Sequence, residues 1–215
     1  MKRNAIFLTV AIISLIAFIL WTILLAFIDV QPVGPLYSSI GFATINKFVH
    51  NLTGENLILY LITDWLSFMP VFIMIFFAIL GILQFIKRKN LFKVDFDLLC
   101  LGIFYILLFS LYIIFENVII NYRPILIDGI LEVSYPSSTT LLTVCVMSTA
   151  NWQLNYRVKK GKLKLILNIL TKIFTAFMVV CRFLSGVHWF SDIVGGLFLS
   201  VSLEYFYYFL VDIKS

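Results

Sequence analysis

Two side chains that can share a proton lie close together near the end of a strongly apolar sequence. His188 and Asp192 are four residues apart, a spacing that puts both on one face of a helix and lets the carboxylate hold the imidazole. Arg182 stands six residues before His188, and its planar, always charged guanidinium suits an anionic oxygen. A reactive ring, its orienting acid and an anion clamp are the parts of a phosphate-handling site.

The composition of the surrounding chain departs from that of a soluble protein. Of its 215 residues, 62% are hydrophobic and 13% are charged, whereas a soluble domain is about half apolar and about a quarter charged. The excess is concentrated in uncharged runs of the roughly 20 residues that cross a bilayer. The sequence therefore predicts an integral membrane protein, with residues 1–215 forming one domain.

Six apolar runs are long enough to act as membrane spans. The first could instead be a signal peptide, but it is longer than the apolar core of about 7–15 residues typical of one, and no small-residue cleavage site follows it. We therefore predict an all-α, six-span transmembrane helical bundle. The predicted spans are residues 5–28, 65–86, 98–119, 136–152, 165–181 and 189–211.

The segment between the first two spans contains a shorter periodic pattern. Over residues 42–52, apolar side chains recur at spacings of three and four, which indicates a short amphipathic helix. Such a helix fits the membrane surface. A loop helix packed on the bundle explains the pattern equally well.

The net charge of +5 is distributed in a way that indicates membrane orientation. Most lysine and arginine residues fall before the first span or in the short loops after the second and fourth spans, whereas the outer segments contain only Lys47, Arg123 and Arg182. Cytoplasmic loops are typically the basic ones. We therefore expect both termini in the cytoplasm, an active site facing outward from the cell membrane, and no nucleic-acid partner.

The cysteines give no sign of a disulfide framework or a metal centre. Cys100, Cys145 and Cys181 lie in or beside apolar runs, without a pairing pattern and without a nearby cluster of histidines. Neither the spacing of a structural zinc site nor that of a small secreted scaffold is present. We therefore expect no metal and no cofactor.

The polar segments on the outer side resemble the motifs of the type 2 phosphatidic acid phosphatase (PAP2) superfamily. The pattern of that family is K-x6-R-P, then P-S-G-H, then S-R-x5-H-x3-D, on a helical bundle. This chain has Asn-Tyr-Arg-Pro at 121–124 and Tyr-Pro-Ser-Ser-Thr at 135–139. In the third motif Arg182, His188 and Asp192 match, and Cys181 stands where the family has serine. The resemblance covers about residues 96–211, and the six-span layout is similar to that of bacterial membrane members.

The resemblance implies a metal-independent lipid phosphate phosphatase. In such an enzyme His188 would attack phosphorus and carry a phosphohistidine, while Asp192 would orient the ring. The lipid tail of a phosphate or diphosphate substrate would enter between spans from the bilayer. Guanidinium and backbone N–H donors would surround the phosphate oxygens. This binding set comprises Arg123, Arg182, Ser137, Ser138, Thr139 and Gly186.

Two positions depart from the family pattern in ways that affect the chemistry. The lysine of the first motif falls at Glu116, which reverses a charge, and the histidine of the second motif falls at Thr139. That histidine protonates the leaving oxygen in the family. Threonine cannot donate a proton in this way at neutral pH, and a positioned acid or base contributes about 10²–10⁴-fold to a rate.

Three interpretations of these departures stay open. A diphosphate releases a phosphate, which is a weak base, so a polyprenyl diphosphate would need an acid less than phosphatidic acid does. Alternatively, Glu116 supplies the proton, since desolvation favours a protonated carboxyl; an ion pair with Arg123 is the simpler interpretation of that residue. Finally, the chain has lost hydrolysis and binds or senses lipid phosphates. His50 is a further candidate acid, although a solvated or interfacial ring explains it more simply.

Overall fold

The computed structural model describes residues 2–159 and 161–213. Within these residues the regular elements are helices, and the β-type pairing is limited to isolated β-bridges in the connections. The elements in chain order are α1 (Lys2–Phe27), η1 (Pro35–Tyr37), α2 (Ala43–Thr53), α3 (Leu57–Leu66), α4 (Phe68–Arg88), η2 (Leu91–Lys93), α5 (Phe96–Asn117), α6 (Ser138–Arg157), α7 (Gly161–Leu184) and α8 (Phe190–Asp212).

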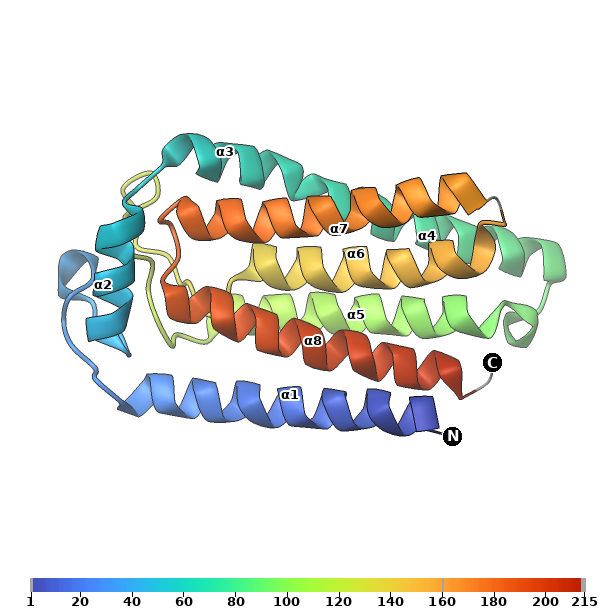
Figure 1. Ribbon diagram of the computed structural model, residues 1–215, viewed down its shortest axis with the longest axis horizontal. Coiled ribbons are helices and arrows are strands. Elements are labelled where there is room, and N and C mark those ends of the chain that lie inside the picture. Colours follow the sequence, from blue (N-terminus) through green and yellow to red (C-terminus); the bar gives the residue numbers. More distant parts are fainter. Residues whose placement is uncertain (1, 160, 214–215) are drawn as a thin grey trace.

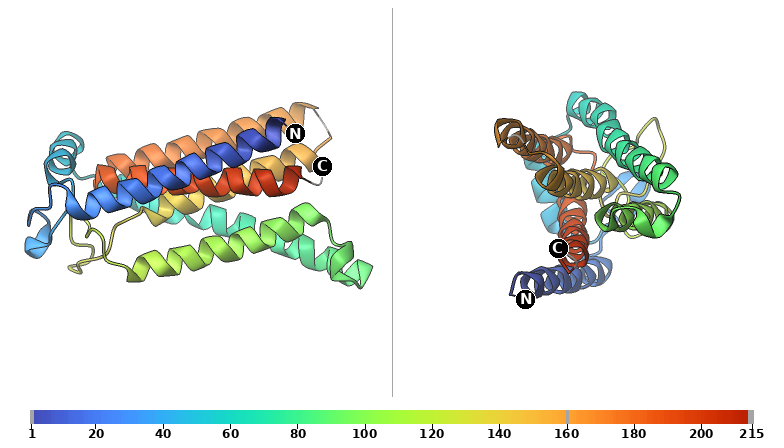
Figure 2. Two further views of the ribbon diagram at one scale, coloured as in Figure 1. Left: turned by 90° about the horizontal axis from the view of Figure 1, so that it is seen from below. Right: turned by 90° about the vertical axis from the view of Figure 1, so that its right-hand side faces the viewer.

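The long helices form a single elongated bundle (Figure 1). Helices α1, α5, α6, α7 and α8 run along its length, α3 and α4 together make one further span, and α2 lies across the end opposite the two termini. Figure 2 shows α1 at one edge of the bundle, where it packs along α8, and α4 beside α5 at another. The predicted all-α transmembrane bundle is therefore confirmed.

The number of spans depends on how α6 is counted. Five helical segments of the described residues are long and apolar enough to cross a membrane: Arg3–Phe27, Leu57–Arg88, Phe96–Asn117, Gly161–Leu184 and Phe190–Asp212. Helix α6 lies among α4, α5, α7 and α8 and faces protein more than lipid. Two of its polar side chains find partners inside the bundle: Thr149 donates to the Cys145 carbonyl, and Gln153 donates to the Tyr207 hydroxyl. A helix surrounded by protein needs less apolar surface than one exposed to lipid.

The second span is longer than predicted and is interrupted near its outer end. The helix begins at Leu57, and Ser67 separates α3 from α4. Pro70 lies three residues beyond this break, and because proline has no N–H it cannot bond to the carbonyl four residues before it, which kinks helices. As a result α3 packs on α7, while α4 packs on α5 and α6.

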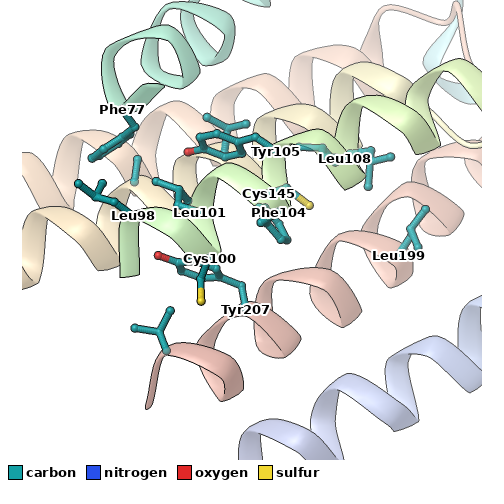
Figure 3. Close-up of a cluster of buried hydrophobic side chains, with 14 of the residues drawn as sticks. Phe77, Leu98, Cys100, Leu101, Phe104, Tyr105, Leu108, Cys145, Leu199 and Tyr207 are labelled. Atoms are coloured by element: carbon teal, nitrogen blue, oxygen red, sulfur yellow. The ribbon is translucent and has the colours of Figure 1, made fainter. Parts of the chain in front are cut away.

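The hydrophobic core joins α5 to the helices around it (Figure 3). Buried residues of α5 include Leu101, Phe104 and Leu108, which recur at the spacing of a helix face. They meet Cys145 of α6 and Tyr207 of α8 in the same cluster. All three cysteines are buried. This core fixes the three helices whose outer ends carry the candidate motifs.

The predicted amphipathic helix in the first outer segment is α2. Its buried residues, Ala43 and Asn46, face the bundle, and α2 packs against the start of α8. Ile45, Phe48 and Leu52 remain exposed on its other side. One face of α2 is therefore a packed loop helix, as one interpretation held, while the other face is apolar and exposed.

Candidate active site

The three motifs meet at the end of the bundle that α2 covers. The connection from α5 to α6 and the connection from α7 to α8 both lie there, opposite the termini (Figure 1). The Ser137 N–H donates to the main-chain carbonyl of Asp192 at 3.0 Å. The start of α6 is thus bonded directly to the start of α8, which brings the second and third motifs together.

His188 and Asp192 form the centre of this region and are almost completely buried, with 4% and 0% of their surfaces exposed. Asp192 is the third residue of α8, and its Oδ2 accepts a hydrogen bond from the Trp189 N–H at 2.9 Å. The same oxygen lies 3.6 Å from His188 Nδ1. On the other side of the ring, Nε2 lies 3.4 Å from Arg123 Nη1. The carboxylate therefore faces one ring nitrogen, and the guanidinium faces the other.

The surroundings of His188 favour its neutral form. Burial, followed by the positive charges of Arg123 and Arg182, lowers the pKa of His188 well below its usual range. At neutral pH the ring is consequently uncharged. An uncharged imidazole keeps a lone pair on one nitrogen, which a nucleophile requires.

Arg123 is held by the folded connection between α5 and α6. Tyr122 pairs with Val133 across this connection, and the Arg123 N–H donates to the Glu132 carbonyl at 3.0 Å. The Arg123 side chain forms an ion pair with Glu132, at 2.9 Å between Nε and Oε2. Sequence reasoning missed Glu132, because only the reversal of the chain brings it to Arg123. No ion pair joins Glu116 and Arg123 in the part of the chain that the structure describes, so the simpler interpretation of Glu116 was wrong.

A small cavity brings several of the predicted residues together. Its volume is about 10 Å³, which is room for roughly one water molecule. A phosphate group is larger, so its entry requires the lining side chains to move apart. Residues from α5, both motif connections and α6 line this cavity, among them Tyr112, Glu116, Arg123, Ser134, Ser138 and His188.

Arg182 is not among the residues that line this cavity, and its side chain is held by α3. It is 3% exposed, its Nη1 donates to Thr63 Oγ1 at 3.3 Å, and its guanidinium lies 5.1 Å from the centre of the Tyr60 ring. That distance suits a cation–π contact. Tyr60 and Thr63 are functional neighbours that sequence reasoning missed; their spacing of three within an apolar run was the available signal.

The second motif contributes mainly to the architecture of the site. Ser137 is the N-cap of α6, and its Oγ accepts from the N–H and the hydroxyl of Thr140. Ser138, the first residue of α6, lines the cavity, whereas Thr139 is buried and does not. The first N–H groups of a helix have no partners within that helix and attract anions. The start of α6 is thus the part of this motif that can meet a phosphate.

Gly186 and His50 lie on the outer side of the loop that carries His188. Gly186 has a φ of 70°, and a Cβ there would come within 2.2 Å of the Gly54 carbonyl oxygen. His50 Nε2 lies 3.1 Å from the Gly186 oxygen, and the His50 ring packs against Trp189. Neither residue is among those that line the cavity. Gly186 and His50 therefore contribute to the shape of the loop that carries His188.

Comparison with known proteins identifies this part of the chain. Residues 116–214 match the family model of the PAP2 superfamily. This segment, here called the PAP2 region, is similar to that superfamily. The predicted resemblance to this superfamily is thereby confirmed, and the PAP2 region contains Arg123, Arg182, His188 and Asp192.

The fold of the whole chain agrees with this finding. It is similar to the crystal structure of a transmembrane PAP2-type phosphatidylglycerolphosphate phosphatase from Bacillus subtilis, with a TM-score of 0.66 and 15% identity. The similarity covers 96% of this chain and 98% of that chain. No curated protein matches the sequence. The fold is therefore that of a multi-pass membrane protein.

Proposed function

We propose that this protein is a membrane lipid phosphatase that acts through a phosphohistidine on His188. The observation that carries the proposal is the placement of the His188 ring, with Nδ1 facing Asp192 and Nε2 facing Arg123. His188 also lines the cavity that holds Glu116 and the start of α6. An oriented nucleophile, a cation and helix N–H groups around one space are the parts that phosphoryl transfer needs.

The proposed reaction has two steps. Nε2 of His188 forms a bond to phosphorus while the bond from phosphorus to the leaving oxygen breaks, and its electron pair departs with that oxygen. Water then attacks the phosphohistidine, which releases phosphate and restores the neutral ring. Asp192 stabilises the positive charge of the ring through the proton on Nδ1, and Arg123 offsets the charge of the phosphoryl oxygens.

Glu116 is our proposed proton donor to the leaving oxygen. It lines the same cavity as His188 and Arg123, and the ion pair of Arg123 is made with Glu132 instead. Thr139 lies outside that cavity lining. A weakly basic leaving group reduces the demand on this acid, and for this reason we prefer a polyprenyl diphosphate to phosphatidic acid as substrate.

An apolar groove supports a long substrate tail. A space of about 640 Å³ lies between α4 and α5. Leu98, Gly102, Tyr105 and Phe109 line it from α5 at spacings of three and four, and the same spacing continues to Tyr112 and Glu116 in the phosphate cavity. At 1.5 Å per residue, this face is about 27 Å long, close to the roughly 30 Å of a hydrocarbon core. A tail that follows the whole face is longer than one leaflet, as a polyprenyl chain is.

Filling the groove tests the tail assignment. A Cβ on Gly102 would meet open space, so we expect Gly102→Phe to fold and to raise the KM for a long polyprenyl diphosphate at least about tenfold, at little cost for a ten-carbon prenyl diphosphate. The control is Ile103→Phe, at a neighbouring position on α5 that is 70% exposed. Equal KM values for the long substrate in the two variants would contradict the assignment.

The function itself is tested by phosphate release from detergent-purified protein. We expect the wild type to release phosphate from a polyprenyl diphosphate faster than from phosphatidic acid. Comparable turnover of both lipids would remove the substrate preference but keep the phosphatase. Absence of release from either, with lipid binding that depends on Arg123 and Arg182, would instead support the alternative of a lipid-phosphate binder. The observations that favour this alternative are Thr139 in place of an acid and the existing pair of Arg123 with Glu132.

The proposed location is the cell membrane, with the site facing outward. The start of α1, the end of α8 and the connections after α4 and α6 lie at the end of the bundle opposite α2 (Figure 1). Because basic ends stay in the cytoplasm, this arrangement supports an outward-facing His188. The lipid substrate and the bilayer are the partners that the proposal requires.

A further inference from the structure

Asn46 of α2 is a buried side chain whose amide nitrogen and oxygen both have partners at the site end of the bundle. Its surface is 0% exposed. Its Nδ2 donates to the Gly41 carbonyl and to the Ser191 hydroxyl, both at 2.8 Å, and its Oδ1 accepts from the Ser191 N–H at 3.0 Å. One side chain of α2 therefore binds both the backbone and the side chain of a residue in α8.

Ser191 is the neighbour of Asp192 and connects it to this contact. The Ser191 hydroxyl donates a hydrogen bond to Asp192 Oδ1 at 3.4 Å. It also accepts a hydrogen bond from Asn121 Nδ2 at 3.4 Å. Trp21 of α1 donates its indole N–H to the Ser191 carbonyl at 3.1 Å. Three segments that are far apart in the sequence thus converge on the first turn of α8.

We propose that Asn46 is a positioning residue for the reaction, acting through Ser191 on Asp192 and thereby on His188. The N–H groups in the first turn of a helix lack partners within it, and Trp189, the N-cap of α8, provides no side-chain acceptor for them. Asn46 supplies an acceptor from a different helix. The angle of this turn decides where the Asp192 carboxylate points, and so how the imidazole is held.

The chemistry of the contact requires an amide. The Ser191 N–H needs an acceptor, and the Ser191 hydroxyl oxygen can accept a hydrogen bond. The Asn46 amide meets both, because its oxygen accepts from the N–H and its nitrogen donates to the hydroxyl. An aspartate would lose the donor, and an alanine would lose both bonds. Because α2 precedes residues 116–214, the inference makes the geometry of the PAP2 region depend on a helix outside it.

The experiment compares kcat and KM of Asn46→Ala with those of Asn51→Ala, a matched change at an exposed position of the same helix. It rests on the proposed function, so wild type and His188→Ala are measured alongside. We expect Asn46→Ala to lower kcat about 10²-fold and to change KM less than about threefold, while Asn51→Ala behaves as wild type.

A double-mutant cycle distinguishes positioning from a general loss of structure. If Asn46 acts through Asp192, the Asn46→Ala change should lower kcat little further in the Asp192→Asn background. Additive losses, or an Asn46→Ala enzyme equal to wild type, would overturn the inference while leaving the phosphatase intact. Full turnover by His188→Ala would instead overturn the proposed function.

A second variant covers the case in which Asn46→Ala does not fold. Ser191→Ala removes only the hydroxyl that links Asn46 to Asp192 and keeps the backbone bond to Asn46. We expect this variant to melt near the wild-type temperature and to lose kcat with KM preserved. A Ser191→Ala enzyme with wild-type kcat would overturn the inference.

Discussion

Replacing His188 by alanine is expected to abolish phosphate release, with kcat falling about 10⁴-fold or more. The reason is that Nε2 of this ring, which lies 3.4 Å from Arg123 Nη1 in a residue that lines the cavity, is the proposed nucleophile. The measurement is phosphate release from a polyprenyl diphosphate by purified protein. A second readout is the acid-labile phosphoryl group that the wild type should carry after brief exposure to a labelled substrate.

The other histidine provides the matched control for this experiment. The chain has two histidines, and His50 lies against Gly186 and Trp189 on the outer side of the loop. His50→Ala should keep the phosphoryl label and lose less than about tenfold in kcat. A phosphoryl label on the His188→Ala variant, or loss of the label from His50→Ala alone, would show that His188 is not the nucleophile.

Lipid binding by the same variant separates the two candidate functions. Alanine at position 188 removes the nucleophile but leaves both arginines and the start of α6 in place, so binding should persist. A phosphatase then becomes a binder by one substitution. If the wild type already binds without turnover, His188→Ala changes nothing, and the chain is a lipid-phosphate binder.

The parts of the site that can be predicted from the sequence are those whose residues lie close together along the chain. His188 and Asp192 are four residues apart and do come together, at 3.6 Å between Nδ1 and Oδ2. The expected single helix face was wrong, because His188 lies in the connection before α8 and only Asp192 belongs to that helix. The spans were predicted because lipid exposure requires long apolar runs. Helix α6 shows where this signal weakens, since Gln153 bonds to Tyr207 of α8 and Thr149 bonds to a carbonyl of its own helix, so these polar side chains need no water.

The supporting residues could not be predicted, because their partners lie far away along the chain. Asn46 and Ser191 are 145 residues apart, and Arg182 and Thr63 are 119 apart. An asparagine or a threonine in an outer helix has no periodicity that names its partner. Glu132 was missed for a similar reason, since a reversal of the connection after α5 brings it to Arg123. The helices could therefore be predicted from the apolar runs of the sequence, whereas the contacts that support the site residues could be identified only from the three-dimensional structure.

Replacing Arg123 by glutamine is expected to lower kcat/KM about 10³-fold, because a donor aimed at developing charge contributes about 10²–10³-fold and the ground-state phosphate contact is lost as well. A second effect concerns pH. Arg123 helps to lower the pKa of His188, so its removal should raise that pKa. Because protonated His188 cannot attack phosphorus, the loss of rate on acidification should begin at a higher pH than in the wild type.

The charge left behind on Glu132 decides how this result is interpreted. Glu132 is partly exposed and pairs with Arg123, so Arg123→Gln leaves a carboxylate near the site that repels phosphate. The double variant Arg123→Gln with Glu132→Gln removes both charges together. If repulsion caused the loss, the double variant recovers; if the guanidinium itself stabilises the transferred phosphoryl group, it stays slow. We expect the second outcome together with the shifted acidic limb, since the guanidinium lies 3.4 Å from His188 Nε2; rates that recover, or an unshifted limb, would remove Arg123 from the reaction.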